Sequence, residues 1–379
     1  MDSSIGKYSK LNLDALAKAK EDGKVIVGTY CTFSPHEIIM AAGAIPIGLC
    51  SYKNEPIAAA EKVLPANLCP LIKSSYGAAV TGSCPYFAAS DFVVAETTCD
   101  GKKKMYELLG RIKPMIVLEL PQCTGSSFEL EVWVSELKRL KTWLEERLGV
   151  EITRERLREA IKTMNRERRL RQEVYSFFKE DRLPMSGLSM HSVMAAGNSP
   201  VNREAYMGEM EKLVVHLEDC VTNGWYVNQN GQPRILVTGC PTGQGSEKVL
   251  RLIEECGAFI VGQESCNGIK AFDTLVDEDK EPLLAIAERY LSIGCPVRTP
   301  NQGRFDLLGR LVKDFKADGV VDLTWQGCQT YHVESYSIKQ FLMAEYRIPL
   351  LQVVTDYSES DTEQLRTRIR AFVEILESR

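Results

Sequence analysis

The residues whose side chains could most clearly do chemistry are twelve cysteines spread along the chain. The smallest spacing between neighbouring cysteines is the ten residues from Cys256 to Cys266, so no CxxC pair occurs. That spacing argues against zinc ribbons and ferredoxin-like cluster motifs, which use closely spaced thiols. A free thiol can still bind metal, take part in catalysis or be buried as a small apolar group. Which of these applies depends on where the fold places each cysteine.

The N-terminal segment predicts the compartment in which these thiols work. The segment MDSSIGKYSKLNLDALAKAKEDGK has no apolar core of signal-peptide length, and nowhere do 18 apolar residues run together. We therefore expect a cytoplasmic protein with no membrane segment. In a reducing compartment the cysteines stay unpaired, which removes the disulfide explanation.

Composition excludes several classes of partner. The formal net charge is -5, from 46 basic and 51 acidic residues, with 44% apolar and 26% charged residues. This balance is typical of an ordinary soluble protein and not of a surface that covers nucleic-acid phosphates. The cluster Lys102-Lys103-Lys104 is interpreted as the solvated face of a helix. With 379 residues the chain suits two or three domains.

Short apolar runs predict the elements that would position the thiols. In the first third, runs rich in Val and Ile without clean alternation are typical of parallel strands covered on both faces, and they span residues 24–31, 44–50, 91–99 and 115–123. Helix-like segments such as SPHEIIMAAG and CPLIKSSYGAAV lie between them. This alternation predicts a doubly wound α/β domain over residues 1–125.

The rest of the chain repeats this pattern after a helical interruption. Residues 126–232 are dominated by charged amphipathic segments and predict helices, with PMSGLSMHSVMAAGNSP as a looser connection or short helix. Strand-like runs then return at residues 234–240, 257–266, 318–328 and 348–356. We expect a second doubly wound, Rossmann-like domain over residues 233–379, with a site in the cleft between the two.

Most cysteines fall where such domains bind ligands. The carboxyl ends of parallel strands meet at one edge of a sheet, and seven cysteines close predicted strands: Cys31, Cys50, Cys99, Cys123, Cys240, Cys266 and Cys328. Cys69 opens a helix at the same edge, and Cys295 follows an irregular apolar segment that joins it. Cys84, Cys220 and Cys256 are predicted at the opposite edge, as small hydrophobic residues.

Converging thiolates from distant positions suit a soft metal centre. Their number exceeds the four that one zinc ion uses, which favours an iron–sulfur cluster over zinc. The histidines add no zinc set, since only His36 and His332 follow strand-end cysteines while His191 and His216 lie in the helical middle. The segment TGCPTGQGSEKVL lacks the Gly-Lys-Ser/Thr ending of a phosphate loop, and no GxSxG elbow occurs.

Six phrases of the chain carry a recognisable pattern: GTYCTFSPHEIIMAAGAIPIGLC, NLCPLIKSSYG, VVAETTCDGKKKMYELL, ILVTGCP, IGCPV and RTRIRAFVEIL. Together they resemble the 2-hydroxyacyl-CoA dehydratase and benzoyl-CoA reductase superfamily, and within it most closely the double-cubane cluster proteins. The resemblance covers nearly the whole chain. It implies two α/β domains with iron–sulfur chemistry in the cleft between them, and a homodimer.

The resemblance also implies a set of ligands. The three cysteines that hold a four-iron cluster in the dehydratases match Cys69, Cys99 and Cys328. The double-cubane branch holds an [8Fe-9S] cluster through six cysteines, and the further three match Cys240, Cys266 and Cys295. Cys31 and Cys50 also match family phrases and could replace one of these six. Cys123 lies in a segment that matches no family motif and is a further alternative ligand.

The function implied is an ATP-dependent, low-potential reduction of a small molecule. Electrons would come from a separate activator ATPase with its own [4Fe-4S] cluster, since the chain has no Walker motif of its own. Lys73 and Lys102 are candidates to offset the negative charge of the cluster. The candidate proton donors are the titratable residues nearest to strand-end cysteines: His36, Glu37, Glu264 and His332.

Two other functions stay open. One is a subunit of a 2-hydroxyacyl-CoA dehydratase, a lyase with a single [4Fe-4S] cluster and a second, non-identical subunit. The other is an electron-storage or electron-transfer protein without a substrate of its own.

Overall fold

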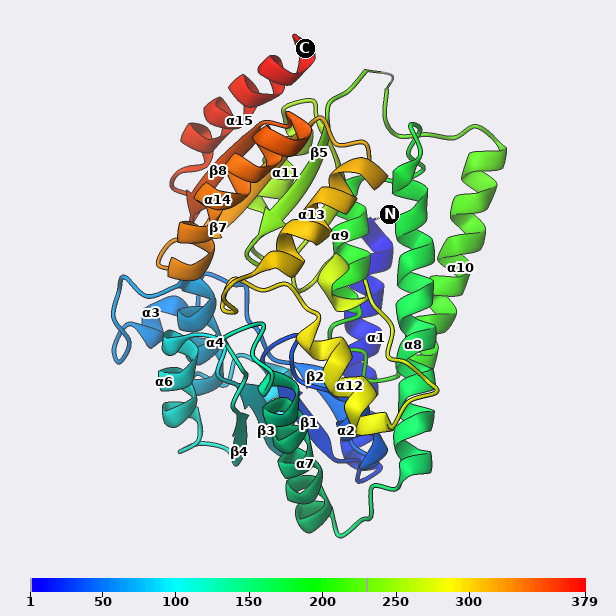
Figure 1. Cartoon of the computed structure of the whole chain (residues 1–379), viewed down its shortest axis with the longest axis vertical. Helices are drawn as coiled ribbons and strands as arrows, with labels where there is room; N and C mark the ends of the chain where they lie inside the picture. Colours follow the sequence, from blue (N-terminus) through cyan, green and yellow to red (C-terminus); the bar gives the residue numbers. More distant parts are fainter. Residues whose placement is uncertain (1, 230) are drawn as a thin grey trace.

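The computed structural model describes residues 2–229 and 231–379, and their side chains from residue 11 onward. Two four-stranded parallel sheets lie one in each half of the molecule (Figure 1). The first sheet contains β1 (Ile26–Thr29), β2 (Ile45–Gly48), β3 (Phe92–Glu96) and β4 (Met115–Leu118). The second contains β5 (Arg234–Gly239), β6 (Phe259–Glu264), β7 (Gly319–Trp325) and β8 (Leu350–Thr355). The predicted α/β class with two Rossmann-like sheets is confirmed.

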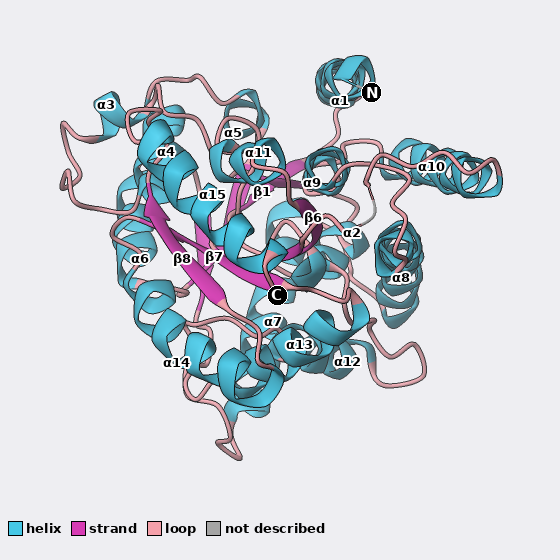
Figure 2. Cartoon of the chain, turned by 90° about the horizontal axis from the view of Figure 1, so that it is seen from above, coloured by secondary structure: helices cyan, strands magenta, loops and turns pink. Residues whose placement is uncertain are grey.

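Helices surround both sheets (Figure 2). The helices of the first 125 residues are α1 (Asp2–Glu21), α2 (His36–Ala41), α3 (Ile57–Ala60), α4 (Pro70–Val80), α5 (Pro85–Ala89) and α6 (Asp100–Leu109). The middle of the chain contributes α7 (Glu129–Leu148), α8 (Arg154–Ser176), the 3-10 turn η1 (Phe177–Lys179), α9 (Gly187–Ala196) and α10 (Arg203–Thr222). The last third contributes α11 (Lys248–Glu255), η2 (Ile269–Ala271), α12 (Pro282–Leu291), α13 (Gln302–Asp314), α14 (Gln329–Tyr346) and α15 (Thr362–Glu377).

The strand orders create a matching pair of crevices. The first sheet has the order β2-β1-β3-β4 and the second the order β6-β5-β7-β8. In each sheet the chain first winds to one side of a strand and then returns to its other side, between β1 and β3 or between β5 and β7. Such a switch point opens a crevice at the carboxyl ends of the two strands, which is where open α/β sheets bind ligands.

Burial of the strands explains why their sequences are almost continuously apolar. Every residue of β1, β6 and β7 is buried, including Gln263, Glu264 and Asp322 within the second sheet. A strand covered on both faces has no solvent side that would call for alternating polar residues. The polar side chains that do occur in these strands are therefore exceptions that need specific partners.

The predicted helical region of residues 126–232 is shared between the two sheets. Trp133 and Leu137 of α7 pack into a core with β1, β3 and α2, whereas Met190 of α9 and Met210 of α10 pack with β6 and α13. Helix α8 runs beside both halves (Figure 1). The domain boundaries near residues 125 and 232 stay a prediction of the sequence.

The last third of the chain returns to the first sheet before it completes the second. Helix α12 packs against α7 and α8, and its residues Ile286 and Tyr290 belong to the core of the first sheet. A third core joins the two halves directly and contains Cys69 and Cys240. Within residues 2–229 and 231–379, no helix has the length and apolar character needed to cross a membrane.

Candidate iron–sulfur site at the junction of two sheets

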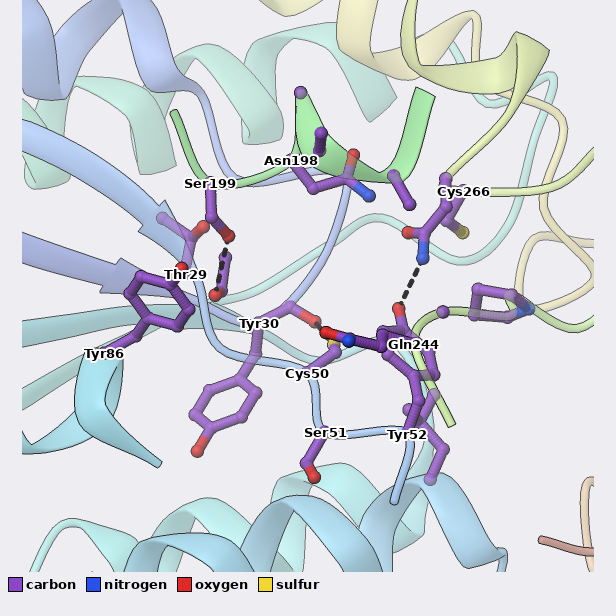
Figure 3. A pocket seen from close by; sticks show the side chains of 18 of the residues that line it. Thr29, Tyr30, Cys50, Ser51, Tyr52, Tyr86, Asn198, Ser199, Gln244 and Cys266 are labelled. Carbon is purple, nitrogen blue, oxygen red and sulfur yellow. Dashed lines mark hydrogen bonds between the residues drawn. The ribbon is translucent and has the colours of Figure 1, made fainter. Parts of the chain in front are cut away.

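A cavity of about 1150 Å³ lies at the junction of the two halves (Figure 3). Its walls come from the loops after β1 and β2, from the loop after β5, from α8 and from α9 with the residues that follow it. Cys31, Cys50 and Cys266 line it, together with polar side chains that include Tyr52, Asn198 and Gln244. The cavity is thus large enough for a small molecule and has thiols on its wall.

The first thiol group consists of Cys69, Cys99, Cys240 and Cys328. Cys69, Cys99 and Cys328 are the residues immediately before α4, α6 and α14, at the N-cap positions. Cys240 directly follows β5, at the switch point of the second sheet. Three helix N-termini therefore point their free N–H groups toward one set of sulfur atoms, an arrangement that favours negative charge.

Contacts within this first group involve thiols from both halves of the chain. Hydrogen bonds from Cys240 and Cys69 lower the pKa of Cys328 well below its ordinary value, which favours its ionised form. The same contact with Cys328, followed by burial, raises the pKa of Cys69. The backbone N–H of Trp325 also donates to Cys240 Sγ at 3.4 Å. Cys99 lies close enough to Cys328 to be influenced by its charge.

Gly327 permits the close approach that joins the halves. Its φ is +77°, and a Cβ atom there would lie 2.6 Å from the Asn67 carbonyl oxygen and 3.0 Å from the Cys69 backbone nitrogen. Any other residue would have to push the loop before α4 away from the loop before α14. The glycine therefore sets the spacing between Cys69 and Cys328.

The second thiol group consists of Cys31, Cys50, Cys266 and Cys295. A hydrogen bond to Cys266, followed by burial, raises the pKa of Cys31. Burial raises the pKa of Cys50 to about 11 and that of Cys295 to about 12, and the charge of Cys31 adds to both. Cys31 follows β1 in the first half, and Cys266 follows β6 in the second half. This group, like the first, is assembled across the junction.

These donors fit an iron–sulfur centre better than a zinc ion. Iron–sulfur clusters are bound chiefly by cysteine thiolates, and the two groups supply eight thiols without a histidine or carboxylate among them. In the part of the chain that the structure describes, no three His, Cys, Asp or Glu side chains are placed to share one metal ion. All six cysteines predicted as ligands belong to the two groups, and Cys31 and Cys50 join them.

Of the two lysines predicted to face a cluster, only Lys102 lies among the thiols. Its Nζ atom donates to the Tyr30 carbonyl at 3.0 Å, on the cavity wall. Although burial alone would lower it, the pKa of Lys102 is raised by the negative charges of neighbours that include Cys31 and Cys50. Lys73 instead forms a 2.7 Å ion pair with Glu61 and donates to the Ala66 carbonyl at 2.6 Å.

Among the four predicted proton donors, His36 is the one that lines the cavity. Its Nε2 atom lies 3.3 Å from Thr29 Oγ1. Burial, followed by the charge of Arg203, lowers the pKa of His36 to about 3, so the imidazole is neutral near pH 7. A neutral imidazole can orient a bound molecule or relay a proton, but it carries no surplus proton to give.

Glu37 is held on both carboxylate oxygens, by Arg168 at 2.6 Å and by the Tyr290 hydroxyl at 2.8 Å. Burial alone would raise its pKa, but the charges of Arg168 and Arg289, together with hydrogen bonds, outweigh burial and lower the pKa to about 2. Glu37 is therefore ionised over the working pH range. Because it does not line the cavity, its role here is to fix Arg168 and Tyr290.

Glu264 and His332 are also absent from the cavity wall. Glu264 is fully buried and pairs with Lys270 at 2.6 Å and with Arg304 at 3.3 Å. His332 is exposed on α14, one turn after Cys328. Both residues were predicted near the thiols because each is close to a cysteine in the sequence. Their side chains do not line the cavity.

Two further cysteines differ from their predicted surroundings. Cys84 was predicted at the opposite edge of the sheet, but it caps α5, accepts from the Phe87 N–H at 3.3 Å and lines the cavity. Its short helix begins closer to the cleft than the sequence pattern suggested. Cys123 lies five residues beyond the end of β4 and is exposed, pairing through its backbone with Thr299.

A polar wall supplied by α8 and α9 was not predicted from the sequence. Arg168, Arg171 and His191 all line the cavity, although α8 was interpreted only as a charged amphipathic helix and α9 as a looser connection or short helix. The spacing of these arginines in the sequence contained a signal for this wall. Arg168 and Arg171 are three residues apart and share the helix face that also carries the apolar Met164 and Val174.

Comparison with known proteins identifies relatives over almost the whole chain. Residues 31–376 match the model of the family described as 2-hydroxyglutaryl-CoA dehydratase, D-component. The protein YjiM of Escherichia coli (strain K12), provisionally named as a dehydratase subunit, is 45% identical over 357 residues, which cover 94% of this chain and 93% of the relative.

More distant relatives carry enzyme names. The lactoyl-CoA dehydratase subunit beta of Anaerotignum propionicum is 24% identical, with 94% of this chain and 93% of the relative covered. The (R)-phenyllactyl-CoA dehydratase beta subunit of Clostridium sporogenes is 26% identical with the same coverage. The resemblance to the 2-hydroxyacyl-CoA dehydratase and benzoyl-CoA reductase superfamily is confirmed, and the likeness to its double-cubane branch stays a prediction.

Proposed function

Because the chain belongs to the 2-hydroxyglutaryl-CoA dehydratase D-component family, we propose that it is an ATP-dependent, low-potential reductase of small molecules. Its two thiol groups would hold a double-cubane [8Fe-9S] cluster. Electrons would come from a separate activator ATPase with its own [4Fe-4S] cluster. When bound, the cluster supplies electrons at low potential.

The observation that carries the proposal is the presence of two thiol groups and not one. A single four-iron cluster uses at most four cysteines, whereas two groups of four gather at the junction of the sheets. The second group contains Cys31, Cys50 and Cys266, which also line the cavity. A small molecule in the cavity would therefore lie against the second group.

The chain's own residues would bind and screen the substrate. The cavity is walled by both halves of the protein, so a molecule inside it would be partly screened from bulk water. His36, neutral at its wall, would accept or donate a hydrogen bond to the bound molecule. Lys102 places a positive charge beside the thiols, where it favours their ionised form and a higher electron affinity of the bound centre.

Iron and sulfide analysis of protein purified without oxygen tests this proposal. We expect roughly eight irons per chain, which is the number in the implied cluster. Cys328→Ala and Cys266→Ala should each lower the iron content. Cys220→Ala is the matched control, because that thiol is buried in α10 next to His216, away from both groups. Full iron in all three variants would refute the assignment.

A second candidate is favoured by the names of the relatives, several of which are dehydratase beta subunits. As such a subunit, the chain would hold one [4Fe-4S] cluster, need a non-identical partner subunit and act on a coenzyme A thioester. About four irons per chain would support the dehydratase subunit. In that case the Cys69, Cys99 and Cys328 variants should lose iron, and a Cys266 variant should keep it.

The electron-transfer reading and the homodimer are tested by separate measurements. A reduced protein that passes electrons to an acceptor protein, but reduces no small molecule, would favour electron transfer. The large cavity with polar groups on its wall instead supports a substrate of its own. Sedimentation of the anaerobic protein should give the mass of two chains.

A further inference from the structure

One wall of the cavity contains an unusual group of buried charges. Arg168 and Arg171 on α8, Arg203 at the start of α10 and Arg289 on α12 form what we term the arginine wall. Each of these arginines is at most 9% exposed. Arg168, Arg171 and Arg289 line the cavity, and Arg203 lies behind them. Buried guanidinium groups need nearby negative charge or acceptors to offset the loss of water.

Two glutamates compensate only part of this charge. Glu37 pairs with Arg168 at 2.6 Å, and Glu167 pairs with Arg171 at 3.1 Å and also with Arg203. Arg289 forms no ion pair with any residue that the structure describes and donates to the carbonyls of Ala271 and Thr274. Four guanidinium groups thus face two carboxylates, which leaves two positive charges in excess.

A neighbouring carboxylate does not remove the excess. Asp273 is close enough to Arg289 to influence it, but both of its oxygens accept from Arg310 at 2.7 Å. The charges of the wall contribute, after burial, to two lowered pKa values. Burial, followed by the charge of Arg203, lowers the pKa of His36 to about 3. Burial, followed by the charge of Arg168, lowers the pKa of Arg289 to about 10.

Two donors in this wall are buried without an acceptor. Among the residues that the structure describes, Arg168 Nε and Arg203 Nη2 have no hydrogen-bond partner. Arg168 lines the cavity. Buried polar groups are nearly always paired, so an unpaired guanidinium donor beside a cavity indicates a missing acceptor. The missing acceptor must also be negative to balance the charge.

We propose that the arginine wall is an oxyanion-binding subsite that holds a carboxylate or phosphate group of the molecule bound in the cavity. The planar guanidinium group binds such oxygens through paired hydrogen bonds, and Arg168 and Arg171 lie one helical turn apart on the cavity wall. The cavity also reaches Cys31, Cys50 and Cys266. An anionic substrate anchored at the wall would extend its uncharged end toward these thiols.

This inference deepens the proposed function, since it names an anionic class of substrate. It does not depend on the cluster for its test. Calorimetric titration of the anaerobically purified chain with sodium phosphate, and separately with sodium acetate, would be run at constant ionic strength set by chloride. We expect saturable binding of one anion per chain. Tighter phosphate binding identifies a phosphate-bearing ligand, and tighter acetate binding identifies a carboxylate; failure of both to bind overturns the proposal.

Variants identify the wall as the binding site. Arg168→Gln should weaken binding about tenfold, as expected for loss of a charged donor. Because that change leaves Glu37 buried without its cation, the double variant Glu37→Gln with Arg168→Gln removes both charges and should bind equally weakly. Glu167→Gln should tighten binding by removing a competing carboxylate. Arg169→Gln is the control, since Arg169 lies on the same helix but is exposed and pairs with Glu278.

The iron content of each variant separates this proposal from the proposed function. Anion binding by a chain with little iron would support the subsite and count against the cluster. Full iron with no anion binding would refute the subsite alone. Equal weakening by Arg168→Gln and Arg169→Gln, or no change with Glu167→Gln, would also refute it.

Discussion

Cys31 and Cys123 both follow predicted strands, yet the structure gives their thiols opposite surroundings. Cys31 hydrogen-bonds to Cys266 and lies near Lys102 and Glu96. Cys123 lies beyond the end of β4, is exposed and contacts Thr299 through its backbone. The chemistry of a cysteine therefore depends on which loops converge on it, and a strand end is only the first requirement.

Cys31→Ala should lower the iron content of the anaerobic protein, because the second thiol group then loses one thiol and the hydrogen bond between Cys31 and Cys266. Cys123→Ala should leave iron content unchanged. Atomic absorption of the two purified variants, with visible spectra to follow the cluster, provides the comparison. Equal iron in both would show that Cys31 is not a ligand.

His36 should make stability depend on pH. The pKa of His36 is about 3 in the folded protein and 6.5 in the unfolded chain. As the pH falls, the unfolded chain therefore binds a proton first. Stability is therefore lost progressively below pH 6.5 and down to about pH 3. Between pH 7 and pH 5 the loss from His36 is about 2 kcal/mol. Urea unfolding at these two pH values measures it.

His36→Gln should reduce this difference in the free energy of unfolding between pH 7 and pH 5. His216→Gln offers a matched control, since His216 is exposed on α10. Should both variants keep the full difference, the assignment of the acid sensitivity to His36 would be wrong.

Helix N-termini are the elements that organise the first thiol group, and the loops before them set the spacing. Gly327→Ala should displace the start of α14, because the added Cβ would meet Asn67 oxygen at 2.6 Å in a backbone conformation that disfavours side chains. We expect a loss of about 1–3 kcal/mol in stability and a lower iron content. Thermal unfolding and iron analysis are the measurements.

Gly208→Ala is the control for that change. Gly208 is in the interior of α10, and a Cβ there would meet nothing within 4 Å. Alanine should stabilise the helix by about 0.5–1 kcal/mol and keep the iron. A Gly327→Ala protein that behaved like Gly208→Ala would show that the close approach is not needed.

All eight strands could be predicted from the sequence, because strands covered on both faces by helices are mostly apolar. The cysteine-rich edge followed from the same runs, since parallel strands end together. The pairing of thiols across the junction could not be predicted. It depends on contacts such as that of Gly327 with Asn67, which are 260 positions apart and leave no local pattern.

The arginine wall escaped prediction for a related reason. Arg168 and Arg171 belong to a helix with many charged residues, most of which face solvent. Charge on an amphipathic helix normally indicates the exposed side. Their spacing beside Met164 and Val174 is a weak signal, and it is the packing of α2, α10 and α12 around α8 that places these arginines inside the protein.

For the whole molecule, the thiol groups act as links between its two halves. Each group takes cysteines from both sheets, so a bound cluster would hold the halves together. Loss of the cluster should loosen the loops before α4, α6 and α14. Hydrogen exchange of the iron-loaded and the iron-free protein should show faster exchange at residues 66–72, 97–102 and 326–331 in the latter. Helix α10, remote from the thiols, is the internal reference, and equal acceleration there would indicate general unfolding.

The return of α12 to the first sheet has a consequence for how the protein is made. The core around β1 and β3 includes Ile286 and Tyr290, together with Trp133 and Leu137 of α7. A nascent chain released only as far as residue 232 would lack Ile286 and Tyr290 and would leave part of that apolar surface open. The first half of the protein therefore completes its core only after α12 (Pro282–Leu291) of the second half has been synthesised. Until then it depends on protection from aggregation, as large chains with long-range contacts do.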